Sequence, residues 1–479
     1  MQTSLYTPKI KRILSKSKGL KVALFDKRSY TVLSTCVPHT YFLNNDYFLL
    51  TMIEDKKRIK MEQLTCCAFI SKEGIANLMQ ELKEPFYGAY NLYFLNAVNE
   101  DSLKELAKAD TSNKVNEVFE IFIDMHQIDD KLFVINEKEE EIGDNHRINS
   151  IVSILNTLEI QPIVCSSTNL KDFANELAFS IEKYSLKKCG NVFIFDRKKD
   201  MITPLVFNWY YQPMLYDYTD YSLGLITLHK KTYQIFNDDI FTKTRFTNIA
   251  ELKNQILETK EQKSEKIDFD DLFKTNILTD NNNKIETHLT LHNFITAGSV
   301  KNGLLSDLEY TIISDKSFFK NNQEKIHSVL KDKNINFHFR LKFFLINTLC
   351  HLDIDSKKDV LISNWFVKKY PEFIEYFYKF LDLYQPKKDI LPSFAKEKDL
   401  KLGYTPVIMK YIKNLINNQT KNFYFARKSL FRKNEQLILY FKGGITLYEY
   451  QCIQQQYPNT IVLADHLIGY KNILERIVS

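Results

Sequence analysis

Residues 191–217 read NVFIFDRKKDMITPLVFNWYYQPMLYD and form the most distinctive stretch of the chain. The apolar run at 191–195 predicts a buried strand. A polar turn follows it, in which Arg197 stands between the two carboxylates Asp196 and Asp200. A cation between two acids suits a locally paired turn, so we interpret this turn as part of a structural junction.

The second half of the stretch is rich in aromatic side chains. Thr203 and Pro204 precede a segment with Trp209, Gln212 and Met214, which predicts the start of a helix. Aromatic side chains with polar tips supply a large apolar anchor that still needs hydrogen-bond partners. We expect this anchor to hold the junction between neighbouring parts of the fold.

The N-terminal part of the chain alternates between strand and helix signals. Residues 72–83 carry apolar side chains at helical spacing, which indicates a helix with one buried face. Strands that are apolar throughout and separated by helices are typical of a parallel sheet covered on both faces. We therefore predict a doubly wound α/β domain over 1–125, with strands at 21–25, 47–51, 66–70, 91–95 and 118–124.

A second α/β pattern is split between two distant parts of the sequence. Strand signals at 132–135, 162–165 and 191–195 recur only near the C-terminus, at 437–441 and 460–464. The C-terminal βαβα pattern is too small to fold alone. We expect residues 126–222 and 433–479 to form one second α/β domain, with the acidic segment 137–145 as a solvated loop.

The region between these halves, 223–432, predicts a mainly helical third domain. Its strand signals are weak, and 237–239 and 280–284 carry loop signals. Six of the aromatic side chains in residues 366–384 follow one another at alternating spacings of four and three, which predicts one buried stripe on a helix. The predicted fold class is thus α/β plus all-α, with a helical domain inserted into the second α/β domain.

Composition excludes several classes of protein. The 479 residues are 44% hydrophobic and carry a net charge of only +6, so the chain can bury a full core and is not a dedicated nucleic-acid binder. Seven cysteines without metal-ligand spacing favour a reducing cytosol, with the thiols as small buried side chains. No stretch approaches 18 apolar residues, so we expect no membrane span.

No catalytic or cofactor-binding motif was found. Glycine-rich phosphate loops, nucleophile elbows and paired histidine motifs are absent from the sequence, so we predict no enzyme activity, no cofactor and no metal. Asp196 at a strand end and the pair Gly443-Gly444 after another strand leave a degenerate phosphatase or nucleotide-dependent enzyme as the alternative. That alternative requires Asp196 and Gly444 to converge on one open pocket.

The stretch 191–217 resembles the Sec-one/Munc-eighteen (SM) family, which regulates SNARE-mediated membrane fusion. The shared positions are Asp196, Arg197, Asp200, Thr203, Pro204, Trp209, Tyr211 or Tyr210, Gln212 and Met214. GLKVALFDKRSYTVLS (19–34) is similar to the family's opening strand, and 436–478 is similar to its closing strands and helices. LYFLNAVNEDSLKELAKAD (92–110) resembles the vacuolar-protein-sorting branch.

This resemblance implies a non-catalytic binding protein whose three domains form an arch. It implies that a syntaxin-like SNARE binds in two modes, through a short N-terminal peptide on the outside of domain one and as a helical bundle in a central cavity. The assembled SNARE complex is a further candidate partner. The implied location is the cytoplasm and the surface of Golgi and endosomal membranes, reached through the partner.

The resemblance also implies the residues that bind the partner. For the peptide pocket it points to Leu103, Leu106, Val118 and Glu120, an apolar pocket with an acidic rim. From the residues alone, a plain core role for Leu106 and Val118 is equally well supported. The basic run at 55–60, with Lys56, Lys57, Arg58 and Lys60, suits a helical bundle, and its alternative interpretation is a solvated helix face.

Two alternatives in function stay open at this point. One is another branch of the same family, serving the ER–Golgi route, the plasma membrane or the vacuole. The other is the degenerate α/β enzyme centred on Asp196.

Overall fold

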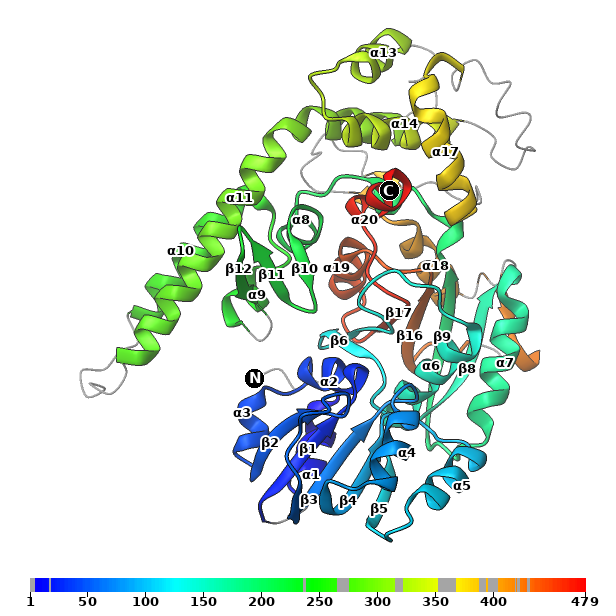
Figure 1. Cartoon of the computed structure of the whole chain (residues 1–479). Helices are drawn as coiled ribbons and strands as arrows, with labels where there is room; N and C mark the ends of the chain where they lie inside the picture. The colour runs from blue at the N-terminus through cyan, green and yellow to red at the C-terminus, as the bar shows by residue number, and fades with distance from the viewer. Residues whose placement is uncertain are drawn as a thin grey trace. The chain divides into compact units, whose positions relative to one another are not determined.

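The computed structural model describes residues 5–16, 19–235, 238–264, 275–314, 322–351, 368–386, 393–394, 404–417, 419, 423–428 and 431–479 (Figure 1). The chain divides into two compact units. Unit one comprises 1–194, 421–440 and 459–466, and unit two comprises 195–420, 441–458 and 467–479. Our division into three domains stays a prediction.

Unit one begins with a five-stranded parallel sheet in the order β2-β1-β3-β4-β5. Its strands are β1 (Lys21–Phe25), β2 (Tyr47–Met52), β3 (Met61–Ile70), β4 (Tyr87–Phe94) and β5 (Val115–Glu120). The helices around it are α1 (Thr7–Leu14), α2 (Lys27–Ser34), α3 (His39–Leu43), α4 (Ile75–Lys83) and α5 (Glu100–Ala109).

Side-chain alternation in this sheet separates two hydrophobic cores. Val22 and Leu24 of β1 belong to the core under α4 and α5, whereas Ala23 and Phe25 belong to the core on the opposite face. The predicted parallel sheet with two covered faces is therefore confirmed. The last strand ends earlier than predicted, at Glu120, because the chain turns away at Phe122, which has a positive φ of 51°.

A seven-stranded sheet follows, in the order β15-β8-β9-β16-β17-β7-β6. Its strands are β6 (His126–Asp129), β7 (Leu132–Val134), β8 (Ile160–Ser167), β9 (Lys188–Asp196), β15 (Phe423–Phe425), β16 (Gln436–Lys442) and β17 (Ile461–Ala464), and it is accompanied by α6 (Asp144–Leu158) and α7 (Lys171–Glu182). The C-terminal strands β16 and β17 lie between β9 and β7, so the predicted pairing of the tail with the earlier strands is present.

Unit two is mainly helical, as expected. Its helices are α8 (Tyr211–Tyr218), α9 (Asp239–Thr244), α10 (Ile249–Ser264), α11 (Thr275–Ser314), α13 (Gln323–Lys331), α14 (Phe337–His351), α17 (Pro371–Tyr384), α18 (Val407–Ile416), α19 (Leu447–Gln456) and α20 (Tyr470–Val478). The long helices α10 and α11 lie side by side (Figure 1). Phe373, Phe377, Phe380 and Tyr384 are buried on α17, which confirms the predicted stripe, while Phe366 lies outside the described residues.

Four predictions about this central region are corrected by the structure. Two groups of strands were not predicted: the antiparallel strands β10 (Asp220–Ser222), β11 (Leu225–Leu228) and β12 (Lys231–Gln234), and the pair β13 (Ser393–Phe394) and β14 (Tyr404–Thr405). The residues of β15 were predicted to belong to the helical region, but β15 pairs with β8. The segment 280–284, predicted as a loop, lies within α11. An asparagine in a helix costs less than about 1 kcal/mol of free energy relative to alanine, which does not prevent helix formation.

The cysteines were predicted to be buried, and this is wrong for Cys189. All seven are free; Cys189 is exposed and Cys452 is half-buried. Cys189 is the second residue of β9, and the first two residues of this strand are exposed, before the strand enters the core. Within the described part of the chain, no helix has the length and apolar character needed to cross a membrane.

Candidate partner-binding site

The predicted peptide pocket is built from α5 and the sheet-edge strand β5. Asn99 caps α5 by accepting a hydrogen bond from the Ser102 N–H at 2.7 Å, so the helix begins before Leu103 and not at it. At the other end, the Asp110 carboxylate accepts from the N–H groups of Lys114 and Val115, at 2.8 and 3.0 Å. This carboxylate therefore fixes the connection from α5 into β5.

Strand pairing decides which way β5 points its side chains. Val118 lies opposite Leu92 and Glu120 opposite Phe94. Leu92 and Phe94 belong to the core under α4 and α5, so Val118 and Glu120 face the side of the sheet that carries α5. The four predicted pocket residues therefore come from two elements on one side of the sheet.

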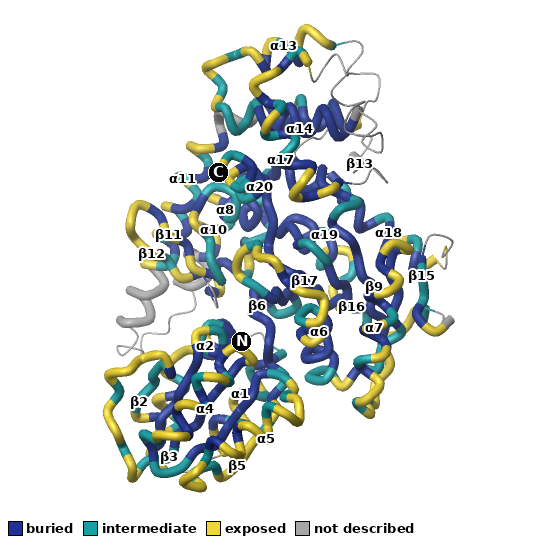
Figure 2. The backbone as a smooth tube through the Cα atoms, turned by 45° about the vertical axis from the view of Figure 1, so that its right-hand side comes forward, coloured by how far each residue is buried: buried dark blue, intermediate teal, exposed yellow. Residues whose placement is uncertain are grey.

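Exposure separates these four residues into surface and core. Leu103 is 39% exposed and Val118 is 46% exposed, whereas Leu106 is only 5% exposed and belongs to the core. The plain core interpretation is thus right for Leu106 and wrong for Val118, because β5 is the outermost strand of the sheet and most of its residues are exposed (Figure 2). Leu103 and Val118 are the apolar groups available to a partner.

Glu120 is exposed, and its carboxylate has a local role as well. Its Oε1 accepts a hydrogen bond from the Val98 N–H at 2.8 Å and so holds the loop that leads into α5. Two more acids, Glu100 and Asp101, lie in the first turn of α5, within 3.6 and 3.9 Å of Lys104. The apolar surface thus has acidic groups around it.

The basic run at 55–60 forms a turn between β2 and β3, so its interpretation as a helix face is wrong. Lys56 and Lys57 are exposed. Arg58 is not available, because its side chain is 6% exposed and its guanidinium pairs with Glu81 at 2.6 Å and lies 4.7 Å from the Phe86 ring centre. We therefore remove Arg58 from the surface that a partner could contact.

The junction at 191–217 is held by an ion pair with a third member that the sequence did not reveal. The Arg197 Nη1 lies 2.6 Å from Glu449 Oε2, and its Nη2 lies 3.3 Å from Asp200 Oδ2. All three side chains are at most 2% exposed. Burial raises the pKa of Asp200, while the positive charge of Arg197 lowers it. Glu449 could not be found from local spacing, since it lies 252 residues from Arg197.

The remaining motif residues pack inside unit two. Thr203 and Pro204 form a buried 3₁₀ turn (Thr203–Leu205), and Tyr404 donates a hydrogen bond to the Thr203 carbonyl at 2.9 Å. Gln212 and Met214 are 1% exposed. Trp209 is half-buried, with its ring edge-on to Phe207 at 4.8 Å between centres. These positions support the structural interpretation of the motif.

The geometry around Asp196 opposes the enzyme alternative. Asp196 is 5% exposed, and its carboxylate caps the following 3₁₀ turn (Arg197–Lys199) by accepting from the Lys198 N–H at 3.1 Å. Gly443 and Gly444 both have positive φ, and a Cβ atom at Gly443 would lie 3.0 Å from the Arg197 Cβ. Side-chain packing therefore occupies the space beside Gly443. Among the described residues, no group of three or more acidic, histidine or cysteine side chains could hold a metal ion.

Comparison with known proteins gives one consistent family. A model of the Sec1 family matches residues 21–475. Vacuolar protein sorting-associated protein 45 of Saccharomyces cerevisiae is 23% identical over 433 residues, covering 81% of this chain and 74% of that protein. Its counterpart in Dictyostelium discoideum is 27% identical over 336 residues, covering 64% of this chain and 59% of that protein.

Solved structures show the same fold. The structure of the SM protein Vps45 has a TM-score of 0.81 at 20% identity, covering 100% of this chain and 98% of that one. The Unc18–syntaxin 1 complex from Monosiga brevicollis has a TM-score of 0.80 at 15% identity, covering 99% and 97%. These matches extend over both compact units.

Proposed function

The chain belongs to the Sec1 family, and from that premise we propose that it regulates SNARE-mediated vesicle fusion in Golgi, endosomal and vacuolar traffic. The match of the family model to residues 21–475 carries the proposal. Relatives named for vacuolar protein sorting support this branch. Solved complexes of Vps45 with the Qa SNARE Tlg2, and of Sly1p with an N-terminal peptide of Sed5p, support a syntaxin-like SNARE as the partner.

In the first binding mode, an N-terminal SNARE peptide docks on α5 and β5. Leu103 and Val118 are exposed apolar side chains on one side of the sheet, and Glu120 lies two residues beyond Val118 on the same face. A few apolar anchors on a preformed surface give specificity at small buried area. The acidic surroundings suit a peptide with a basic end.

In the second mode, the chain holds a helical SNARE bundle and promotes SNARE assembly. The exposed Lys56 and Lys57 are the charged groups that we assign to this contact, without Arg58. The proposal includes no catalysis and no cofactor. It places the protein in the cytoplasm and on Golgi and endosomal membranes, through its partner.

Calorimetric titration with a syntaxin-type N-terminal peptide tests the first mode. Leu103→Arg should fold normally, since the side chain is 39% exposed, and should weaken peptide binding at least about tenfold. Phe179→Arg on α7 is the matched control, because Phe179 is a 74% exposed residue on a helix that packs against β8 of the other sheet. This control should bind the peptide as the wild type does.

Charge reversal at Glu120 needs a second control, because its carboxylate holds the Val98 N–H. Glu120→Gln keeps an acceptor oxygen and removes only the charge, so it should weaken binding most at low salt. Glu120→Lys should weaken it further. Unchanged affinity in both Leu103→Arg and Glu120→Gln would refute this peptide surface and leave family membership untouched.

A further inference from the structure

Positively charged side chains gather on the outer side of α1. Ile10 and Leu14 of this helix are buried in the core on the face of the first sheet opposite to α4 and α5. The helix and the two residues after it contain four bases and no acid, and these bases lie outside the core. They are Lys9, Lys11, Arg12 and Lys16.

A second group of lysines continues this surface within unit one. The Lys9 Nζ lies 5.6 Å from the Phe122 ring centre, and Phe122 packs edge-on against Tyr184 at 5.7 Å between centres. Tyr184 lies in the connection from α7 to β9, and the Lys183 Nζ lies 5.1 Å from its ring centre. Two further exposed lysines follow in this connection and at the start of β9. We call the whole set the α1 basic surface; its members are Lys9, Lys11, Arg12, Lys16, Lys183, Lys187 and Lys188.

Among the described residues, two acids form ion pairs with the α1 basic surface. Glu117 lies 3.4 Å from Lys16, and Glu159 lies 3.7 Å from Lys188. Glu182, at the end of α7, pairs with an arginine outside the set. Seven bases against two acids leave an excess of five positive charges, which is nearly the net charge of +6 of the whole chain.

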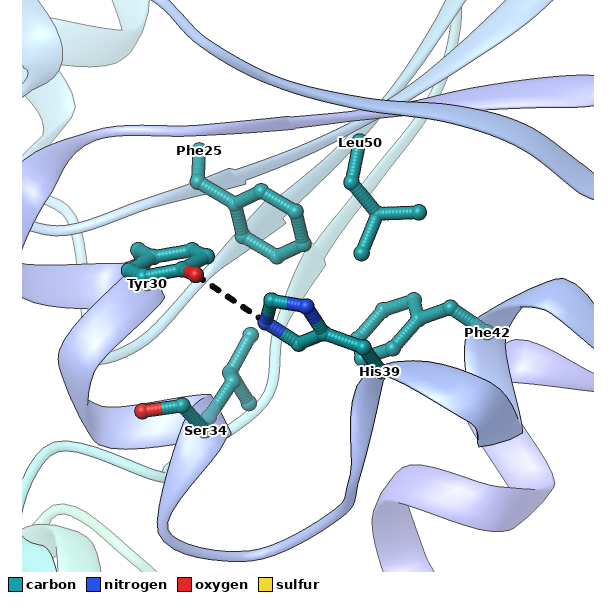
Figure 3. A pocket seen from close by; sticks show the side chains of 7 residues that line it. Phe25, Tyr30, Ser34, His39, Phe42 and Leu50 are labelled. Atoms are coloured by element: carbon teal, nitrogen blue, oxygen red, sulfur yellow. Dashed lines mark hydrogen bonds between the residues drawn. The ribbon is translucent and has the colours of Figure 1, made fainter. Parts of the chain in front are cut away.

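The neighbouring helix α3 supports one side of this surface. The Lys11 Nζ lies 5.2 Å from the ring centre of Tyr41 on α3. This helix is fixed by its own contacts, since Phe42 is 2% exposed and His39 forms a hydrogen bond of 3.0 Å with Tyr30 of α2 (Figure 3). A charge held on a fixed support loses less conformational entropy when a ligand binds.

The positive charges on α1 act on one another. Burial lowers the pKa of Lys9 to about 8, the positive charge of Arg12 acts in the same direction, and Glu159 opposes both. A negatively charged surface placed against α1 would reduce this repulsion and be attracted by the excess charge.

The composition of the α1 basic surface favours a membrane over an acidic peptide or a nucleic acid. Six of its seven bases are lysines, whose compact charges suit a diffuse negative surface, whereas paired recognition of single carboxylates or phosphates uses arginine. Leu20, four residues after Lys16, is 62% exposed and is an apolar group that fits the headgroup layer. Clusters of about four to eight bases on a helix are typical of binding to anionic lipids.

We propose that the α1 basic surface binds the anionic headgroups of a membrane directly. Each basic residue near such a surface strengthens binding by about fivefold, so a few residues give a weak and reversible attachment. A SNARE partner then supplies the second attachment, because stable anchoring needs two signals. This contact goes beyond the proposed function, in which the chain reaches membranes only through its partner.

Cosedimentation of the full chain with lipid vesicles, in the absence of any SNARE, tests the proposal. The chain should bind vesicles of phosphatidylcholine with about one third phosphatidylserine and should not bind pure phosphatidylcholine. Lys11→Glu combined with Arg12→Glu should weaken binding at least about tenfold. The matched control is Lys83→Glu combined with Lys108→Glu, which makes the same charge change at exposed positions of α4 and α5, over the opposite face of the sheet. This control should bind as the wild type does, and melting curves check that both variants are folded.

Salt, soluble competitors and Leu20 identify what is bound. Binding to the anionic vesicles should fall steeply as the salt concentration rises, because salt screens exposed charges. Leu20→Ser should weaken binding at every salt concentration. The soluble headgroup glycerophosphoserine, at the same phosphate concentration, should not displace the chain from the vesicles, because a single headgroup meets few of the charges.

Four results would each overturn the proposal. The first is equal binding to the two kinds of vesicle, and the second is an equal loss of binding in the two charge variants. The third is displacement by glycerophosphoserine, which would indicate a discrete phosphate site. The fourth is tighter binding to polyglutamate than to vesicles of equal charge, which would indicate an acidic protein partner. None of these results would affect the proposed peptide binding at α5 and β5.

Discussion

Arg197 forms ion pairs with two buried carboxylates that come from distant parts of the chain. Asp200 lies in the same turn, and Glu449 lies on α19, where it also completes a capping box with Thr446. A buried charge that loses its partner is far more costly than a missing surface pair. One guanidinium therefore joins the turn after β9 to the start of α19.

Removing this guanidinium should destabilise the protein strongly. Arg197→Ala leaves both carboxylates unpaired, and we expect a loss of about 3–5 kcal/mol in the free energy of unfolding. Chemical denaturation measures this loss, and Lys187→Ala, which removes an exposed charge, should change stability by less than about 0.5 kcal/mol. Normal stability of Arg197→Ala together with lost partner binding would make Arg197 a contact residue.

His126 should make stability depend on pH. It is 4% exposed on β6, and burial lowers the pKa of its imidazole to about 3, with Arg28 acting in the same direction. Below the ordinary pKa of 6.5, the His126 imidazole binds a proton in the unfolded chain but not in the folded chain. The free energy of unfolding therefore falls as the pH drops from about 6.5 toward 3.

The size of this effect follows from the linkage relation. Between pH 6.5 and 5.0 it amounts to about 1.6 kcal/mol. Melting curves of wild type and His126→Gln over this range measure it, and the variant should lose less stability on acidification. Parallel pH profiles for the two proteins would show that His126 is not the responsible group.

At the level of helices and strands, the sequence correctly predicted those elements whose apolar residues recur at a regular spacing. The parallel strands of unit one and the stripe on α17 follow directly from apolar periodicity. The hairpin of β11 and β12 was missed because its turn residues, His229 and Lys230, both have positive φ without being glycine or asparagine.

At the candidate sites, contacts between residues far apart in the sequence could not be predicted from local spacing. The pairing of Arg58 with Glu81, 23 residues apart, and the 252-residue separation of Arg197 and Glu449 leave no trace in local spacing. The exposure of Val118 depends on β5 being an edge strand, which follows only from the order of strands in the sheet.

The β11–β12 hairpin offers a stabilising substitution. Its two-residue turn has φ values of 49° at His229 and 66° at Lys230, which strain ordinary side chains. Replacing the pair by Asn-Gly (His229→Asn with Lys230→Gly) should raise the free energy of unfolding by about 1 kcal/mol. Thermal melting measures this, with Lys231→Gly in β12 as the control that should lower stability. A lower melting temperature for the Asn-Gly variant would contradict the turn assignment.

At the scale of the whole molecule, the C-terminal residues complete a sheet that begins some 300 residues earlier in the chain, with β16 and β17 between β9 and β7. Ile438, Leu439 and Tyr440 of β16 are fully buried, as are Val462 and Leu463 of β17. The seven-stranded sheet is therefore complete only when the last part of the chain is present.

A chain that ends at residue 432 should fail to fold properly. It would leave β9 and β7 as unpaired apolar edges and remove Glu449 from Arg197, so we expect aggregation or degradation. Expression of residues 433–479 as a separate polypeptide in the same cells is the sharpest control, because a fragment that supplies β16 and β17 should restore soluble protein. Gel filtration and melting curves of both preparations measure the outcome. A soluble 1–432 chain that melts cooperatively would show that the first strands form a stable sheet without the C-terminal pair.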